Sequence, residues 1–320
     1  MSLAFDMLLV LLLLGTAVWS VSAREARGAI IAFIACGVLL SLGWMRLGAP
    51  DVALTEAAVG AGLTGMLLLA ATRDSGVEAP PARQAEDSTA TPARPTRILG
   101  GLLCAALSVA LAALVIGLPK PAPSLGPEVA RSLDRLGLGN PVNGVLLGFR
   151  GLDTLIEKVV LLLALVAAWS LAPDRAWGRR PFVTAALRDG PLVLLGRVLP
   201  PIGMVVALYL LWNGATEPGG AFSASTVVAA MWLLVMLAGL RPAPRLARSW
   251  LRGGLALGPL LFFAVGLAGM VMADGFLSFP EAIAKPTIVV LEVALVLSVA
   301  MTLALLFLGP PVAEAAEDSL

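Results

Sequence analysis

Histidine is absent from this chain of 320 residues, and cysteine occurs only at Cys36 and Cys104. Both cysteines fall within apolar stretches at unrelated spacings. Haem, iron–sulfur clusters, zinc and cysteine–histidine nucleophiles therefore lack their usual ligands. We expect no cofactor and no tightly bound metal in this chain, so any redox centre would belong to another polypeptide.

Charge is also scarce, because Asp, Glu, Lys and Arg make up 13% of the residues and the net charge is only +1. The basic residues lie mostly between apolar runs, which gives no indication of nucleic-acid binding. Hydrophobic residues make up 59% of the chain, and the mean hydropathy is +0.93. Runs of about twenty apolar residues recur from end to end, as transmembrane helices require.

The sequence thus predicts an all-α, polytopic membrane protein with about nine transmembrane helices. The expected spans are Leu3–Ala23, Ala29–Met45, Pro50–Thr72, Ile98–Leu118, Leu152–Leu171, Pro191–Trp212, Ala221–Leu240, Leu255–Ala273 and Thr287–Leu308. No basic segment precedes the first run and no small-residue cleavage site follows it, so we expect a retained helix. When the loops alternate through nine spans, Lys and Arg are more than twice as frequent on one side. The positive-inside rule then places the N-terminus outside and the C-terminus inside.

Two polar segments divide the predicted helices into three modules. Residues 73–97 and 172–190 are rich in proline and arginine, and we interpret them as cytoplasmic linkers. They separate a three-helix module at 1–72, a two-helix module at 98–171 and a four-helix module at 191–320. The outside segment at 120–139 has leucines at helical spacing beside charged residues, which suits a short amphipathic helix on the membrane. A simple covering loop is the favoured interpretation of this segment.

Three glutamates interrupt apolar runs, where an unpaired charge is costly. They are Glu56, Glu157 and Glu292, which follow Pro50, Gly151 and Pro286, respectively, by six residues. At 1.5 Å of rise per residue, six residues place a carboxylate roughly 9 Å below the membrane face. The predicted topology brings all three helices in from the outside. We therefore expect the three carboxylates to share one layer in the outer half of the bilayer.

The first glutamate, Glu56, lies beside Thr55 on a helix whose first turn carries Asp51. An acidic residue suits that end of a helix dipole, so Asp51 is interpreted mainly as a terminal carboxylate. The small residues around Glu56 permit close packing. Three glycines between residues 60 and 65 predict either an irregular turn or simply a tight helix contact.

The second glutamate shares a helix face with Asp153 and is followed directly by Lys158. This acid and base either form a buried ion pair that fixes helix packing, or take part in moving an ion. Glu292 has no charge within a helical turn, so its partner must come from another helix, a cation or a retained proton. Sodium near Glu56 and Glu157 and a water-linked proton path both remain open. The turn at 213–222, with a solvated Glu217, is expected simply to connect two helices.

Several strings resemble small membrane subunits of the Mrp-type Na⁺/H⁺ antiporter and of related membrane-bound hydrogenases. The string LGAPDVALTEAAVGAGLTGMLLLA is similar to the MbhD-like part of the large MrpA subunit, and GNPVNGVLLGFRGLDTLIEKVVLLLA to its MbhE-like part. From about Pro191 onward, EPGGAF and VVLEVALVL resemble MrpB. The chain departs from these patterns at Ile156, Lys158 and the residues after Glu292. The added lysine could substitute for a bound cation and favour a proton route.

The resemblance implies a non-catalytic membrane subunit of a multisubunit Na⁺/H⁺ antiporter in the bacterial inner membrane. It implies that the three glutamates line a sodium or proton route and that companion membrane subunits are needed for transport. It assigns no enzyme activity to this chain. Two other hypotheses remain open: a membrane-arm subunit of a redox-driven pump such as a hydrogenase, and a purely structural subunit whose charges hold helices together.

Overall fold

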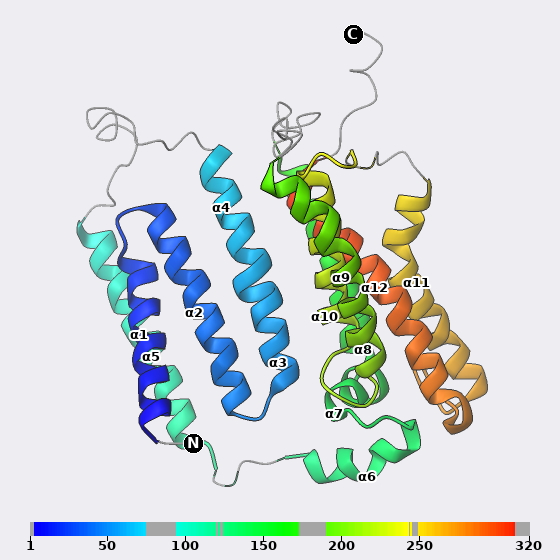
Figure 1. Ribbon diagram of the computed structural model, residues 1–320. Coiled ribbons are helices and arrows are strands. Elements are labelled where there is room, and N and C mark those ends of the chain that lie inside the picture. The colour runs from blue at the N-terminus through cyan, green and yellow to red at the C-terminus, as the bar shows by residue number, and fades with distance from the viewer. Residues whose placement is uncertain are drawn as a thin grey trace.

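A computed structural model describes residues 3–74, 94–119, 121, 124–172, 190–242, 244 and 249–310. These residues form helices joined by short turns, without a β-strand among them. Figure 1 shows α1 to α5 gathered on one side of the molecule and α8 to α12 on the other. The prediction of an all-α polytopic membrane protein is confirmed.

The longer helices are α1 (Leu3–Ser22), α2 (Ala26–Arg46), α4 (Thr64–Asp74), α5 (Arg94–Gly117), α6 (Gly126–Leu136), α8 (Gly151–Ser170), α9 (Pro191–Asn213), α10 (Ala221–Leu237), α11 (Ser249–Met272) and α12 (Ala284–Leu308). Short elements complete the chain: α3 (Pro50–Thr55), the π-helix η1 (Glu56–Leu63), α7 (Pro141–Asn143), the π-helix η2 (Gly144–Phe149) and the 3₁₀ turn η4 (Glu281–Ile283). Each of the nine predicted spans coincides with a helical segment, although α11 begins at Ser249 and not at Leu255.

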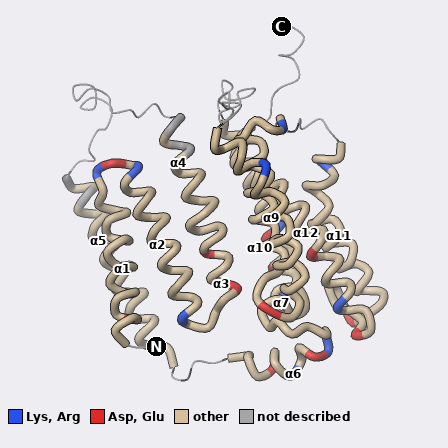
Figure 2. The backbone as a smooth tube through the Cα atoms, viewed as in Figure 1, with Lys and Arg blue, Asp and Glu red and all other residues tan. Residues whose placement is uncertain are grey.

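Seven helical segments in the described part of the chain are long and apolar enough to cross a membrane. Of the other two predicted spans, α10 is apolar but has 17 residues, and α8 has 20 residues that include three charged side chains. The count of nine crossings and the orientation therefore remain predictions. Most charged residues lie near helix ends (Figure 2). The segments that lead to the three glutamates all begin at the same face of the molecule: α3, which continues into η1 with Glu56, α8 and α12 (Figure 1).

The C-terminal helix α12 forms the core of the second group of helices, which consists of α8 to α12. Of its most apolar stretch, 72% is buried, the largest share among the seven long apolar segments. Small residues let α11 approach it closely, because a Cβ added at Gly258 would lie 2.8 Å from Cβ of Ser298. The Ser298 hydroxyl donates a hydrogen bond of 2.6 Å to the Leu255 carbonyl on α11. This packing holds the middle of α12, including Glu292, away from the surface.

The first group of helices, α1 to α5, is built around α2. This helix packs against α1 and against the α3–η1–α4 segment. A Cβ added at Gly37 would lie 2.9 Å from Cβ of Ala61, so α2 and η1 lie in close contact. The Ser41 hydroxyl donates to the Ala53 carbonyl at 2.8 Å. The irregularity that the glycines predicted is present as η1, which begins at Glu56 itself.

The two groups meet mainly through α3 and η1, which lie against α10. Leu63 and Leu67 pack against a buried cluster that includes Leu233 and Leu303. The segment at 120–139 contains a helix, α6. Leu136 of this helix is buried against the second group. The long helix α5 has no buried residue in its apolar stretch. The predicted linkers fall largely outside the described residues.

Candidate functional site

A pocket of about 210 Å³ lies where the two groups of helices meet. Its polar walls come from four elements (α3, α7, α8 and α12) and consist of Thr55, Asn143, Thr154, Glu157, Lys158 and Glu292. Its apolar walls are Leu146, Leu147, Ala221, Phe222 and Leu295. Four of the residues predicted for an ion path therefore line one pocket: Thr55, Glu157, Lys158 and Glu292. Their role in transport remains a prediction.

The Glu292 carboxylate forms the buried end of the site, with only 1% of the residue exposed. Its Oε1 accepts a hydrogen bond of 3.2 Å from Nδ2 of Asn143. The backbone N–H of Ala221 also donates to this carboxylate. Ala221 is the first residue of α10, so Glu292 lies at the positive end of that helix dipole. Of the alternatives left open by the sequence, the structure thus shows partners from other helices, namely an amide side chain and a helix terminus.

The turn before α10 allows the carboxylate to approach this closely. Gly220 has a φ of 99°, which side chains other than glycine rarely adopt. A Cβ at Gly220 would lie 3.4 Å from Oε1 of Glu292. The expectation that residues 213–222 simply connect two helices was therefore incomplete, because this turn also positions donors at the buried carboxylate.

The second Glu292 oxygen, Oε2, has no hydrogen-bond partner among the described residues. Buried polar atoms normally find a partner, so such an atom beside a pocket indicates a place for a proton, a water molecule or a cation. The Asn143 side chain cannot supply this bond through its second amide hydrogen, because Nδ2 also donates to the Gly214 carbonyl at 3.0 Å. Oε2 of Glu292 is therefore a buried oxygen of the site that lacks a hydrogen-bond partner among the described residues.

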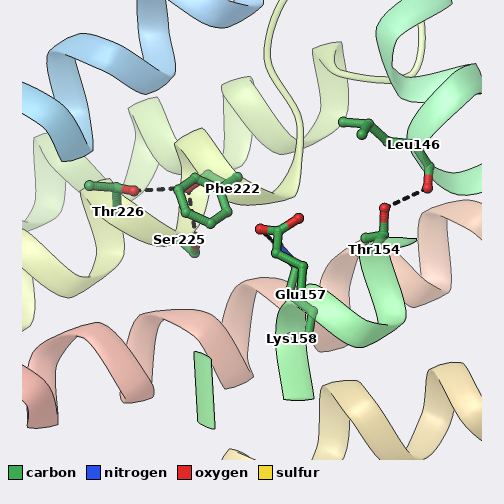
Figure 3. A network of polar contacts seen from close by, with 7 residues as sticks. All are labelled: Leu146, Thr154, Glu157, Lys158, Phe222, Ser225 and Thr226. Carbon is green, nitrogen blue, oxygen red and sulfur yellow. Dashed lines mark hydrogen bonds and ion pairs between the residues drawn. The ribbon is translucent and has the colours of Figure 1, made fainter. Parts of the chain in front are cut away.

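On α8, Nζ of Lys158 lies 2.7 Å from Oε1 of Glu157. The lysine side chain is 6% exposed, whereas the glutamate side chain is 50% exposed. The ammonium also lies 4.6 Å from the centroid of the Phe222 ring, a favourable cation–π distance. Figure 3 shows the Glu157 carboxylate between this ring and Thr154. The predicted Glu–Lys pair is present, and it faces the same pocket as Glu292.

Hydroxyl groups fix the backbone around the pocket. The Thr154 hydroxyl donates to the Leu146 carbonyl at 2.6 Å, which ties α8 to η2 (Figure 3). Ser225 and Thr226 donate to the Phe222 carbonyl at 2.7 Å and 3.0 Å, within the first turns of α10. The Thr55 hydroxyl donates to the Asp51 carbonyl at 3.0 Å. Each hydroxyl oxygen keeps lone pairs that can accept from water.

Asp51 makes contacts that its interpretation as a terminal carboxylate did not foresee. Its Oδ1 accepts from the backbone N–H of Gly219 at 3.0 Å and from Nδ2 of Asn140 at 3.2 Å. Nδ2 of Asn140 also donates to the Glu217 carbonyl at 2.9 Å, and its Oδ1 caps α7. Asp51 therefore joins α3 to the turn before α10 and to the start of α7, beside the pocket but not in its lining.

Two predicted site residues lie apart from the pocket. The Asp153 carboxylate is exposed and forms an ion pair with Arg150, the residue directly before α8. Glu56 is partly buried and folds back over Gly60 within η1, where a Cβ would collide with its carboxylate. The structure does not place Glu56 in the pocket that Glu157 lines. The described residues hold no cluster of three metal-ligating Asp, Glu or Cys side chains, so a sodium site between Glu56 and Glu157 remains only a prediction.

Sequence reasoning did not identify four residues in and around the pocket: Asn140, Asn143, Thr154 and Phe222. An available signal was Asn140 before Pro141, since asparagine followed by proline is typical of a helix start. The chain from Asn140 to Asn143 places the second amide one turn further on. Nothing in the sequence indicated that this amide would meet Glu292, which lies 149 positions later.

Two family models match separate parts of the chain. The MbhD family model, whose description assigns it to MBH, matches residues 11–76. The model MnhB, described as a domain related to the MnhB subunit of Na⁺/H⁺ antiporter, matches residues 191–310. Residues 11–76 are thus similar to the MbhD family, and residues 191–310 to the MnhB-related domain. Thr55 lies in the MbhD-like segment, and Ala221, Phe222 and Glu292 lie in the MnhB-like segment.

A chain in the solved structure of the Mrp complex from Dietzia sp. DQ12-45-1b is similar over 96% of the present chain, with a TM-score of 0.72 and 25% identity. The unmatched 4% of the present chain is too short to contain residues 98–171. The structural similarity therefore extends beyond the two segments that the family models match. The match covers 35% of the Dietzia chain, so this chain spans about a third of its length. No curated protein matches the chain. The predicted resemblance to Mrp-type antiporter subunits is confirmed.

Proposed function

We propose that the chain is a non-catalytic membrane subunit of a multisubunit monovalent cation/proton antiporter, and that its buried carboxylates line part of a route for Na⁺ or H⁺. The pocket is the observation that carries this proposal. It joins Thr55 of the MbhD-like segment, the Glu157–Lys158 pair of the middle module and Glu292 of the MnhB-like segment. Charged groups inside membrane segments are costly, and transporters retain them where ions or protons pass.

The pocket connects an accessible carboxylate to an inaccessible one. The Glu157 side chain is half exposed, whereas Glu292 is 1% exposed. A route for an ion through packed helices needs such a step between the surface and the interior. The hydroxyls of Thr55 and Thr154 supply polar walls between these positions. A purely structural ion pair would be satisfied without a second carboxylate in the same pocket whose Oε2 lacks a hydrogen-bond partner among the described residues.

The proposed partners are companion membrane subunits, the bilayer, and Na⁺ and H⁺, with the bacterial inner membrane as the location. The present chain spans only about a third of the Dietzia chain, and that chain belongs to a solved Mrp complex, which supports an assembly with further membrane subunits. The exposed helix α5 offers an apolar surface for lipid or for such a companion. Transport is therefore expected of the whole complex and not of this chain alone.

The description of the MbhD model favours a second candidate function, the membrane arm of a redox-driven pump. The MbhD model is described as part of MBH, and the membrane arm of a redox-driven pump would need the same buried carboxylates. The proteins that co-purify with the chain separate the two candidates. Antiporter subunits without a nickel or iron–sulfur protein support the antiporter, and a nickel or iron–sulfur protein supports the redox pump.

Conservative substitutions test the proposed route. Glu157→Gln and Glu292→Gln are expected to lower Na⁺-driven proton movement at least tenfold in everted membrane vesicles, while the companion subunits still co-purify. Glu128→Gln is the matched control, because that carboxylate pairs with Arg131 on the exposed face of α6. If the two variants fail to assemble but the surviving complexes transport at the normal rate, the structural hypothesis replaces this one.

A further inference from the structure

The pocket holds an unequal set of charged groups. Among its described lining residues, α8 contributes Glu157 and Lys158 and α12 contributes Glu292, whereas α3, α7, η2 and α10 contribute uncharged residues. One ammonium neutralises one carboxylate, so the second carboxylate needs one further positive charge to make the pocket neutral. Because burial strongly disfavours an uncompensated charge, either a proton or a bound cation must fill this place.

The groups around Glu292 favour the proton. Two N–H donors, from Asn143 and Ala221, point at its carboxylate, and an N–H repels a metal cation. Hard cations need several oxygen ligands, and only Oε2 of this carboxylate is without a partner. A protonated Oε2 needs just one acceptor, which water in the pocket can provide. The volume of about 210 Å³ accommodates roughly seven water molecules at 30 Å³ each.

Lys158 adds a fixed positive charge to the same pocket. Its ammonium is buried, lies 2.7 Å from Glu157 and faces the Phe222 ring, an arrangement that leaves its position well defined. A sodium ion entering the pocket would be repelled by this charge and would compete with it for Glu157. The lysine thus fills the role of the cation that two carboxylates would otherwise bind.

We propose that the ion handled by this pocket is a proton, and that the Lys158 ammonium excludes sodium from it; this inference rests on the function proposed above. The proton leaves Oε2 of Glu292, passes through water and binds the Glu157 carboxylate. Glu292 becomes a carboxylate that Asn143 and the N-terminus of α10 stabilise, and Lys158 stays protonated throughout. One proton shared by two carboxylates keeps the net charge of the pocket unchanged in both states.

The test separates the maximal rate from the sodium dependence in everted vesicles that contain the whole complex. Glu292→Gln, Lys158→Met and Lys158→Arg are compared with Glu128→Gln. The amide oxygen introduced by Glu292→Gln can still accept from Asn143 and Ala221, so this variant retains the packing of α12. Co-purification of the companion subunits is measured first, and if Lys158→Met fails to assemble, Glu292→Gln decides.

The proposal predicts that Glu292→Gln lowers the maximal antiport rate at least tenfold while the half-saturating Na⁺ concentration stays within twofold. Lys158→Met, which removes the charge that excludes sodium, should also lower the maximal rate at least tenfold, and its remaining rate should fall as the Na⁺ concentration rises, because Na⁺ then competes with the proton in the pocket. Lys158→Arg, which keeps the fixed charge, should retain at least a third of the rate. A tenfold rise in the half-saturating Na⁺ concentration in Glu292→Gln would make the pocket a sodium site, which overturns this inference and leaves the proposed function standing. Normal rates and normal sodium dependence in all assembled variants would overturn both.

Discussion

Nδ2 of Asn143 lies 3.2 Å from Oε1 of Glu292, although the two residues are 149 positions apart in the sequence. The amide lies in the predicted middle module, and the carboxylate lies in the segment that is similar to MnhB. The same Nδ2 donates to the Gly214 carbonyl in the turn before α10. A single side chain thereby joins α7, that turn and α12 at the buried end of the pocket.

Replacement of this amide should destabilise the protein. Asn143→Ala removes a donor from a carboxylate that is 1% exposed and from a buried carbonyl. Loss of one partner from a buried polar group costs about 1–3 kcal/mol. Thermal unfolding of the detergent-purified chain should show a clearly lower Tm. Asn213→Ala is the control, since Nδ2 of Asn213 makes only a long contact of 3.4 Å with the Tyr209 hydroxyl. Equal Tm values for the two variants would contradict the assigned role of Asn143.

The carboxylate of Asp51 should hold the turn before α10 against α3. Asp51→Ala removes the acceptor for the Gly219 N–H and for Nδ2 of Asn140. Hydrogen–deuterium exchange of peptides that contain Gly219 is expected to become at least tenfold faster, because the freed amide opens more often. Glu217→Gln serves as the control, since that exposed side chain neighbours the turn but only its backbone carbonyl takes part. An unchanged exchange rate in Asp51→Ala would show that other contacts hold the turn.

The ammonium of Lys158 and the ring of Phe222 should stabilise each other. A double-mutant cycle with Lys158→Met, Phe222→Leu and the double variant isolates their coupling. For a cation 4.6 Å from the ring centroid in a desolvated site, we expect about 0.5–2 kcal/mol. The free energies come from reversible unfolding in detergent by denaturant titration. A coupling below about 0.3 kcal/mol would mean that the ring packs beside the lysine without attracting its charge.

The helical spans could be predicted because apolar runs of membrane length need no tertiary information. The Glu157–Lys158 contact could also be predicted, because residues that are adjacent in the sequence and lie at one depth in the membrane can meet whatever the tertiary structure. Sequence reasoning left the partner of Glu292 open between another helix, a cation and a retained proton. It could not name that partner, because the choice of Asn143 and the Ala221 N–H depends on how α7, α10 and α12 pack. Local patterns carry no information about contacts over 149 positions.

The π-helix η1 shows a second limit. Glycines at 60, 62 and 65 predicted either an irregular turn or close packing, and both are present. The conformation of Glu56 follows from neither signal. Its carboxylate folds over Gly60 in η1, so Glu56 stays out of the pocket that the spacing of the three glutamates led us to expect. The position of a side chain in a widened turn depends on backbone geometry that residue spacing does not encode.

Gly60→Ala tests whether this placement of Glu56 matters for transport. The new Cβ would lie 2.8 Å from Cδ of Glu56, so the carboxyl group must move, whereas the backbone need not. Alanine favours helix over glycine by up to about 1 kcal/mol, so stability should be kept or raised. Antiport in everted vesicles is expected to fall at least threefold with assembly intact. Gly101→Ala on α5 is the control, because its Cβ meets open space. If both variants transport at the normal rate, the position of the Glu56 carboxylate does not contribute to the route.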